Sequence, residues 1–167
     1  MADSAEKVGQ KGEQIFRALL DKTAQPYIYI DQKRESVSNA FWKKSGDKYA
    51  KRPDFLLSVN GFGTIAVDVK HQKLHDKLGS RPHFFISESE VNEAKAFSRL
   101  YGLPWWWAFK NNESSNNHWY WISIKNIEFD MVYDTERTAK LFIDDMTLIS
   151  EPDFISANIY TSLFGKN

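Results

Sequence analysis

Apolar residues recur every three or four positions near the start of the chain, which is the spacing of one face of a helix. The predicted helix runs from about Glu6 to Lys22, and its apolar face consists of Val8, Ile15, Phe16, Leu19 and Leu20. Pro26 ends any continuation, because proline lacks the backbone N–H that a helix needs. The pattern therefore predicts an amphipathic helix followed by extended structure.

Beyond this helix, short runs of β-branched and aromatic residues predict strands. The predicted strands are Tyr27–Ile30, Phe55–Val59, Thr64–Val69, Phe84–Ile86, Trp105–Phe109 and Trp119–Ile124. The Asn60-Gly61 pair separates the second strand from the third. Because both residues accept positive φ angles, this pair predicts an antiparallel hairpin.

A second helix is predicted to follow Ser87. Ser87 and Glu90 form a Ser-x-x-Glu capping box, and Gly102 before Pro104 gives a stop signal close to Tyr101. The pattern is weaker toward the end of the chain. There the predicted elements are strands over Ile127–Val132 and Lys140–Ile149 and a closing helix over Asp153–Phe164.

Composition narrows the class of protein. The chain has 167 residues, of which 42% are hydrophobic, so residues 1–167 are expected to form a single domain around one core. The absence of cysteine excludes disulfides and thiolate zinc sites and fits a reducing intracellular setting. No stretch approaches the roughly eighteen consecutive apolar residues of a membrane span, so we expect a cytoplasmic protein without a membrane partner.

Charge is distributed unevenly along the chain. The formal net charge is zero, but basic residues gather on both sides of positions 54–70. They are Lys43, Lys44, Lys48, Lys51, Arg52, Lys73, Lys77 and Arg81. A local basic excess can attract a polyanion even when the whole protein is neutral.

Two acids and one amine are placed together by the predicted hairpin. Asp54 opens its first strand, and Asp68 and Lys70 lie two residues apart on its second strand, so their side chains share a face. Magnesium prefers hard oxygen ligands, which Asp54, Asp68 and the carbonyl of Val69 would supply. Lys70 is then able to orient or deprotonate an attacking water, or to stabilise negative charge in the transition state.

The order of these residues resembles the PD-(D/E)xK nuclease superfamily, with Pro53-Asp54, a hairpin, and then Asp68-Val69-Lys70. The resemblance implies an α/β fold (α+β mixed sheet) with a restriction-endonuclease-like core, in which helices flank a central mixed β-sheet. It also implies that Asp54 and Asp68 are metal ligands and that Lys70 is the catalytic lysine. Glu13, on the first helix after Gly9 and Gly12, matches the glutamate that completes the metal site in some branches.

From Val8 to Lys110 the layout is similar to that of archaeal Holliday-junction resolvases. The resemblance implies a Mg²⁺-dependent endonuclease, with Mn²⁺ able to replace Mg²⁺, that hydrolyses DNA phosphodiester bonds through a metal-activated water. A structure-specific substrate fits this branch. A homodimer is expected, because two strands of opposite polarity present equivalent phosphates to symmetric sites.

Each of these residues also has a simpler interpretation. Asp68 and Lys70 match a neighbour pair on an exposed hairpin, and Glu13 matches a helix residue that is either solvated or paired with Arg17. Gln72, on the same strand face as Lys70, is either a phosphate or water contact of the site or a polar strand end.

Two groups of residues outside the motif also have more than one interpretation. His71 and His75 have helical spacing for a transition metal, but the zinc-protease glutamate is missing, so we expect a basic substrate-facing loop without zinc. Trp105, Trp106 and Trp107 are able to stack on unpaired bases, although a place in the core is the stronger expectation.

Two other functions remain open from the sequence. One is a non-catalytic nucleic-acid-binding or subunit module that retains the nuclease fold. The other is a ribonuclease that uses the same site, since recognition of the RNA 2′-hydroxyl leaves no readable motif.

Overall fold

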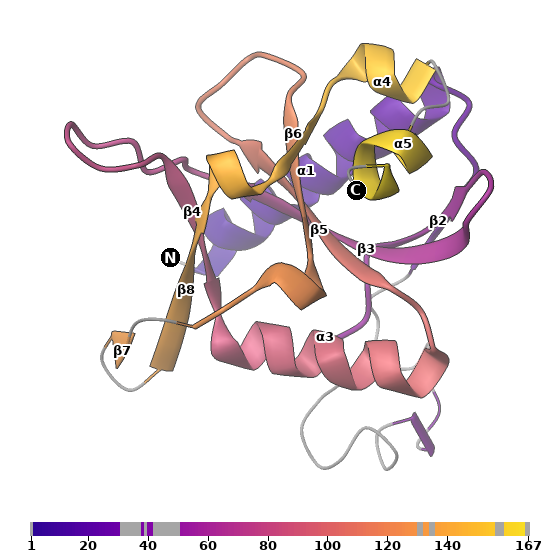
Figure 1. Cartoon of the computed structure of the whole chain (residues 1–167), viewed down its shortest axis with the longest axis horizontal. Coiled ribbons are helices and arrows are strands. Elements are labelled where there is room, and N and C mark those ends of the chain that lie inside the picture. Colours follow the sequence, from indigo (N-terminus) through magenta and orange to yellow (C-terminus); the bar gives the residue numbers. More distant parts are fainter. Residues whose placement is uncertain are drawn as a thin grey trace.

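A six-stranded mixed sheet forms the centre of the protein (Figure 1). The structure is a computed structural model and describes residues 2–30, 38, 40–41, 51–129, 132–133, 136–155 and 159–165. The strand order is β1, β2, β3, β5, β6, β9, and only β3 and β5 pair in parallel. The bounds are β1 Tyr27–Tyr29, β2 Phe55–Val59, β3 Gly63–Gln72, β5 Trp105–Asn111, β6 Trp119–Ser123 and β9 Thr147–Ile149.

Helices and a second sheet cover the two faces of this sheet. On one face lie α1 (Ala2–Lys22), α4 (Glu151–Ile155) and α5 (Ile159–Phe164). On the other lie α3 (Glu88–Tyr101) and a three-stranded sheet of β4 (His83–Ser87), β8 (Glu136–Phe142) and β7 (Val132–Tyr133). None of the described helices is long and apolar enough to cross a membrane.

The central strands are buried because both faces of the sheet are covered. Ile65, Val67 and Val69 of β3 point into the core beneath α1, whereas Ala66 belongs to the core beneath α3. β5 is buried from Trp105 to Lys110. The three tryptophans predicted to favour the core are therefore core residues, with their rings divided between the two faces.

The turn and cap predictions hold, with changes in detail. The hairpin between β2 and β3 forms, but its positive φ angles belong to Gly61 (80°) and Gly63 (119°) instead of Asn60. Ser87 caps α3 by accepting a hydrogen bond from the Glu90 N–H (3.3 Å), and Gly102 ends the helix in the left-handed conformation. Because the two glycines supply the positive φ angles of the turn, Asn60 keeps a negative φ angle.

Three predictions for the last part of the chain hold only in part. Of the strand predicted over Ile127–Val132, Ile127–Phe129 is not a strand although Ile127 is buried, positions 130 and 131 lie outside the described residues, and Val132 begins β7. The strand predicted over Lys140–Ile149 is split by a 3₁₀ turn, η3 (Ile143–Asp145), whose Asp144 and Asp145 reach Arg81. In the closing helix predicted over Asp153–Phe164, the described residues are helical in α4 and again in α5, and positions 156–158 lie outside the described residues.

Helix α1 packs unusually closely on β3 at Gly12. A Cβ atom added to Gly12 would lie 2.5 Å from the Cβ of His71, whereas one added to Gly9 would meet no atom within 4 Å. The His71 ring nitrogen Nδ1 lies 3.2 Å from the carbonyl oxygen of Val8, which ties the same stretch of helix to the strand. Gly12 therefore sets the separation between the helix that carries Glu13 and the strand that carries Asp68 and Lys70.

Replacing Gly12 with alanine is expected to lower the free energy of unfolding. Forcing a methyl group into a tight contact costs about 1–3 kcal/mol, more than alanine gains as a better helix former. The matched variant Gly9→Ala has open space and should gain up to about 1 kcal/mol. Thermal or urea unfolding of both variants checks this, and equal stability of the two would contradict the packing described.

Candidate active site

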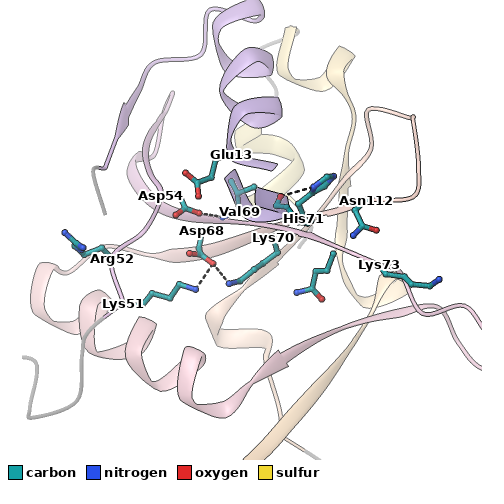
Figure 2. Close-up of a pocket in the computed structure, with 13 residues that line it drawn as sticks. Glu13, Lys51, Arg52, Asp54, Asp68, Val69, Lys70, His71, Lys73 and Asn112 are labelled. Carbon is teal, nitrogen blue, oxygen red and sulfur yellow. Dashed lines mark hydrogen bonds and ion pairs between the residues drawn. The ribbon is translucent and has the colours of Figure 1, made fainter. Parts of the chain in front are cut away.

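An open cleft of about 610 Å³ lies at the end of β3, where this strand meets residues 8–13 of α1 and the segment 51–54 (Figure 2). It is lined by all the residues predicted to bind the metal or take part in catalysis, namely Glu13, Asp54, Asp68, Val69, Lys70 and Gln72. Residues from α1, from β3 and from the segment just before β2 thus meet in one place.

Asp54 takes the place of a missing strand partner. β2 begins at Phe55, which pairs with Val67, while β3 continues to Gln72. The Val69 N–H therefore has no β2 carbonyl to bond, and it donates instead to Asp54 Oδ2 at 2.7 Å. In a strand the N–H and C=O of one residue point to the same side, so the Val69 carbonyl faces this same open end of β2.

Asp68 lies in a cluster of alternating charges. Its Oδ2 atom is 3.2 Å from the ammonium of Lys70 and 3.2 Å from that of Lys51. Both ammonium groups also contact one oxygen of Glu90, Oε1, at 2.5 Å from Lys70 and 2.8 Å from Lys51. The side chain of Asp68 is only 2% exposed, so the interpretation as an exposed strand pair is wrong.

Burial and neighbouring charges shift several pKa values at this cluster. Burial and the charge of Asp68 raise the pKa of Asp54 well above its usual value, although the Val69 N–H opposes this. Burial alone would lower the pKa of Lys70, but Asp68 and Glu90 outweigh burial and raise that pKa. Burial likewise acts to raise the pKa of Glu90, yet Lys70 and Lys51 outweigh it and lower that pKa to about 2.

Glu13 reaches the cleft from α1 and lies close enough to Asp54 to raise the pKa of that acid further, after burial and Asp68 (Figure 2). Its Oε2 atom accepts a hydrogen bond from the Tyr29 hydroxyl at 2.7 Å. Arg17 instead donates to the Tyr27 hydroxyl and lies over the Tyr29 ring, so the predicted Glu13–Arg17 pairing is replaced by these contacts.

The donor set fits a divalent cation of the magnesium type. Among the described residues no group of three or more acidic, histidine or cysteine side chains is close enough to form a metal site by itself. Two buried carboxylates, Asp54 and Asp68, repel each other, and a backbone carbonyl of Val69 faces the same end of the strand. Magnesium usually takes one or two carboxylates and keeps several waters, so this set is sufficient.

Sequence reasoning did not find two members of the cluster. Glu90 was predicted only as a capping residue, but its carboxylate binds Lys51 and Lys70 instead of completing the capping box. Lys51 was one of many basic residues before the motif. No pattern in the sequence links position 51 or 90 to the strand at 68–70, because these contacts arise from the packing of α3 on the sheet.

The other basic residues near the motif divide into three groups. Arg52 and Lys73 line the cleft with Lys51. Arg81 pairs with Asp144 and Asp145 away from the cleft, and Lys77 is exposed. Lys43, Lys44 and Lys48 lie outside the described residues.

The two histidines occupy different structures. His71 is in β3 and His75 follows it, forming an isolated bridge with His83, so helical spacing does not apply to this pair.

The fold is similar to that of Hjc, a Holliday junction resolvase from the archaeal hyperthermophile Archaeoglobus fulgidus. The match covers 82% of this chain and 90% of the resolvase chain, with a TM-score of 0.53 and 18% sequence identity. This chain has a restriction-endonuclease-like fold. The predicted mixed sheet flanked by helices is confirmed. No protein-family model matches the chain, and no curated protein matches it by sequence.

Asp54→Asn is expected to stabilise the protein in EDTA. Asparagine can still accept the Val69 N–H bond, but it removes a buried charge that Asp68 repels. Because the folded pKa of Asp54 is raised, its ionisation makes folding less favourable as pH rises above the ordinary aspartate value. The gain in stability of Asp54→Asn over the parent protein should therefore be present at pH 7 and shrink toward pH 4.

Thermal melts of Asp54→Asn and the parent protein across this pH range measure the effect. Each kcal/mol of added stability should raise the melting temperature by about 2–4 °C. Asp144→Asn removes an exposed carboxylate and is the matched control. A lower melting temperature for Asp54→Asn at pH 7 would contradict the repulsion inferred for the acid pair.

Proposed function

We propose that the protein is a Mg²⁺-dependent endonuclease that hydrolyses DNA phosphodiester bonds, and that residues 1–167 act as one domain. One observation carries the proposal. Asp54, Asp68 and Lys70 converge at the end of β3 in an open cleft, on a fold shared with a resolvase. A fold of this kind serves many functions, so the support for this one comes from the acids and the amine that the cleft holds together.

The residues divide into ligands and a charge stabiliser. Asp54, Asp68 and the Val69 carbonyl would hold the cation, with Glu13 completing its shell from α1. Mg²⁺, or Mn²⁺ in its place, would activate the attacking water and neutralise charge on the phosphate oxygens. Lys70 is held by two carboxylates at 3.2 and 2.5 Å, so it is an ammonium group suited to stabilising negative charge in the transition state. Gln72, farther along the cleft, would contact the phosphate or the attacking water.

The cleft is suited to a nucleic-acid backbone. Arg52 and Lys73 lie on opposite sides of the acid pair along it (Figure 2). Cations on either side of a reacting phosphate would position the neighbouring phosphates without reading sequence. A four-way junction is the DNA structure that the resolvase likeness suggests first. The homodimer and the cytoplasmic location stay predictions from the sequence.

Asp54→Ala and Lys70→Ala should each abolish DNA cleavage while DNA binding survives. The first removes a ligand of the cation and the second removes the ammonium group beside Asp68. Gel assays of cleavage and of binding, with Mg²⁺ and with Ca²⁺ respectively, separate the two effects. Lys125→Ala, an exposed residue outside the cleft, is the control for a lost lysine. Full cleavage by both site variants would refute the assignment.

Cleavage should require a divalent metal and should be strongest on one DNA structure. The test incubates the protein with plasmid, linear duplex, single-stranded and four-way-junction DNA, and with RNA, in Mg²⁺ or in EDTA. Cutting of DNA in Mg²⁺ alone supports the proposal. Retention of DNA in EDTA without cutting in Mg²⁺ would indicate the binding module instead, and cutting of RNA only would indicate the ribonuclease.

A further inference from the structure

Lys51 has no place in the D-x-K arrangement, yet it makes the same two contacts as Lys70. Both ammonium groups touch Asp68 Oδ2 and Glu90 Oε1. The four side chains form a closed ring in which two carboxylates alternate with two ammonium groups. Lys51 reaches this ring from the segment just before Asp54, whereas Lys70 comes from β3 itself (Figure 2).

The contact between Lys51 and Asp68 is an ion pair without directional hydrogen bonding. Asp68 Oδ2 is buried and accepts no hydrogen bond of good geometry from the described residues, although two ammonium groups lie 3.2 Å away. A buried carboxylate needs a nearby cation, because an uncompensated charge in the interior costs several kcal/mol. One ammonium group would balance the charge of a single carboxylate, but two lie beside Asp68.

The second ammonium group is explained by all three neighbouring acids. Asp54, Asp68 and Glu90 together carry more negative charge than Lys70 can balance, and Lys51 also acts on Asp54 electrostatically. A divalent cation between the two acids would supply the same positive charge at the same place. Lys51 and that cation would then repel each other within a few ångströms.

We propose that Lys51 is a built-in counter-ion of Asp68 that a divalent cation displaces, so that Lys51 and the metal ion compete for the same carboxylate. The inference rests on the metal site of the proposed function. Glu90 gives Lys51 a second partner at 2.8 Å, which keeps the displaced ammonium group at the edge of the cleft. The affinity for metal is thereby lower than the two acids alone would give.

Removing the charge of Lys51 is therefore expected to tighten metal binding. Most substitutions in a binding site weaken the binding of its ligand. Isothermal titration of Mn²⁺ into metal-free protein, without DNA and at fixed pH and ionic strength, measures the affinity directly. Lys51→Met and Lys51→Gln should bind Mn²⁺ at least about fivefold more tightly than the parent protein. Lys51→Arg keeps the charge and should restore the parent affinity to within about twofold.

Lys73→Met is the matched control. Lys73 lines the same cleft but pairs with Glu113 instead of Asp68. Its loss removes one positive charge and should change Mn²⁺ affinity by less than about twofold at ordinary ionic strength. Thermal melts in EDTA establish that each variant is folded, and two neutral replacements of Lys51 guard against an effect of one side chain.

The possible results separate this inference from the proposed function. Tighter binding by both neutral variants, with Lys73→Met unchanged, supports the competition. Unchanged or weaker binding by both neutral variants, or an equal gain in Lys73→Met, overturns it and leaves the metal site standing. No Mn²⁺ binding by the parent protein or by any variant overturns the metal site itself, and the inference with it.

Discussion

The site depends on β3 being longer than β2. Where β2 begins at Phe55, the backbone of β3 loses its partner, and the side chain of Asp54 supplies the acceptor that the Val69 N–H would otherwise lack. A buried N–H without a partner is costly, so Asp54 is held in place by the sheet itself. The same ending of β2 opens the cleft and exposes the edge of β3 to which the predicted ligands belong.

The alternation of side chains along β3 determines which face of the sheet Asp68 and Lys70 occupy. Val67 and Val69 face the core under α1, which puts Asp68 and Lys70 on the face covered by α3. A charged side chain buried on that face loses its contact with water, so each charge needs an opposite charge next to it. The first turn of α3, which Ser87 caps, brings Glu90 to this point, where the helix N-terminus also favours a carboxylate. The ring of charges is thus a consequence of how α3 packs.

The sequence predicted most elements of the central sheet and six of the residues that line the cleft, namely Glu13, Asp54, Asp68, Val69, Lys70 and Gln72. Asp54, Asp68 and Lys70 were found because period-2 alternation and a glycine turn are local signals, and Ser87 and Gly102 mark α3 for the same reason. Their meeting with Glu13 was expected only through the resemblance to a nuclease family. The strand order of the sheet was not predicted in detail, since it is set by long-range pairing.

The parts that sequence reasoning missed depend on contacts between distant segments. Lys51 meets Glu90 across 39 positions, and the turn η3, whose Asp144 and Asp145 pair with Arg81, interrupts a predicted strand. Gly12 looked like one of two interchangeable glycines before Glu13. The structure separates them, because of the two only Gly12 lies against His71 of β3. Pairwise packing of this kind leaves no periodic trace in a single sequence.

A structural role alone does not account for the acid at position 54. An asparagine or a serine oxygen would accept the Val69 N–H without placing a second negative charge beside Asp68. A scaffold that only bound nucleic acid would gain nothing from two buried carboxylates that repel each other, and they would weaken its hold on phosphate. A cation bound between the two acids would relieve this repulsion, and that relief would add to the free energy of binding the cation. The close pair of buried acids is therefore the feature on which the proposed metal-dependent activity rests.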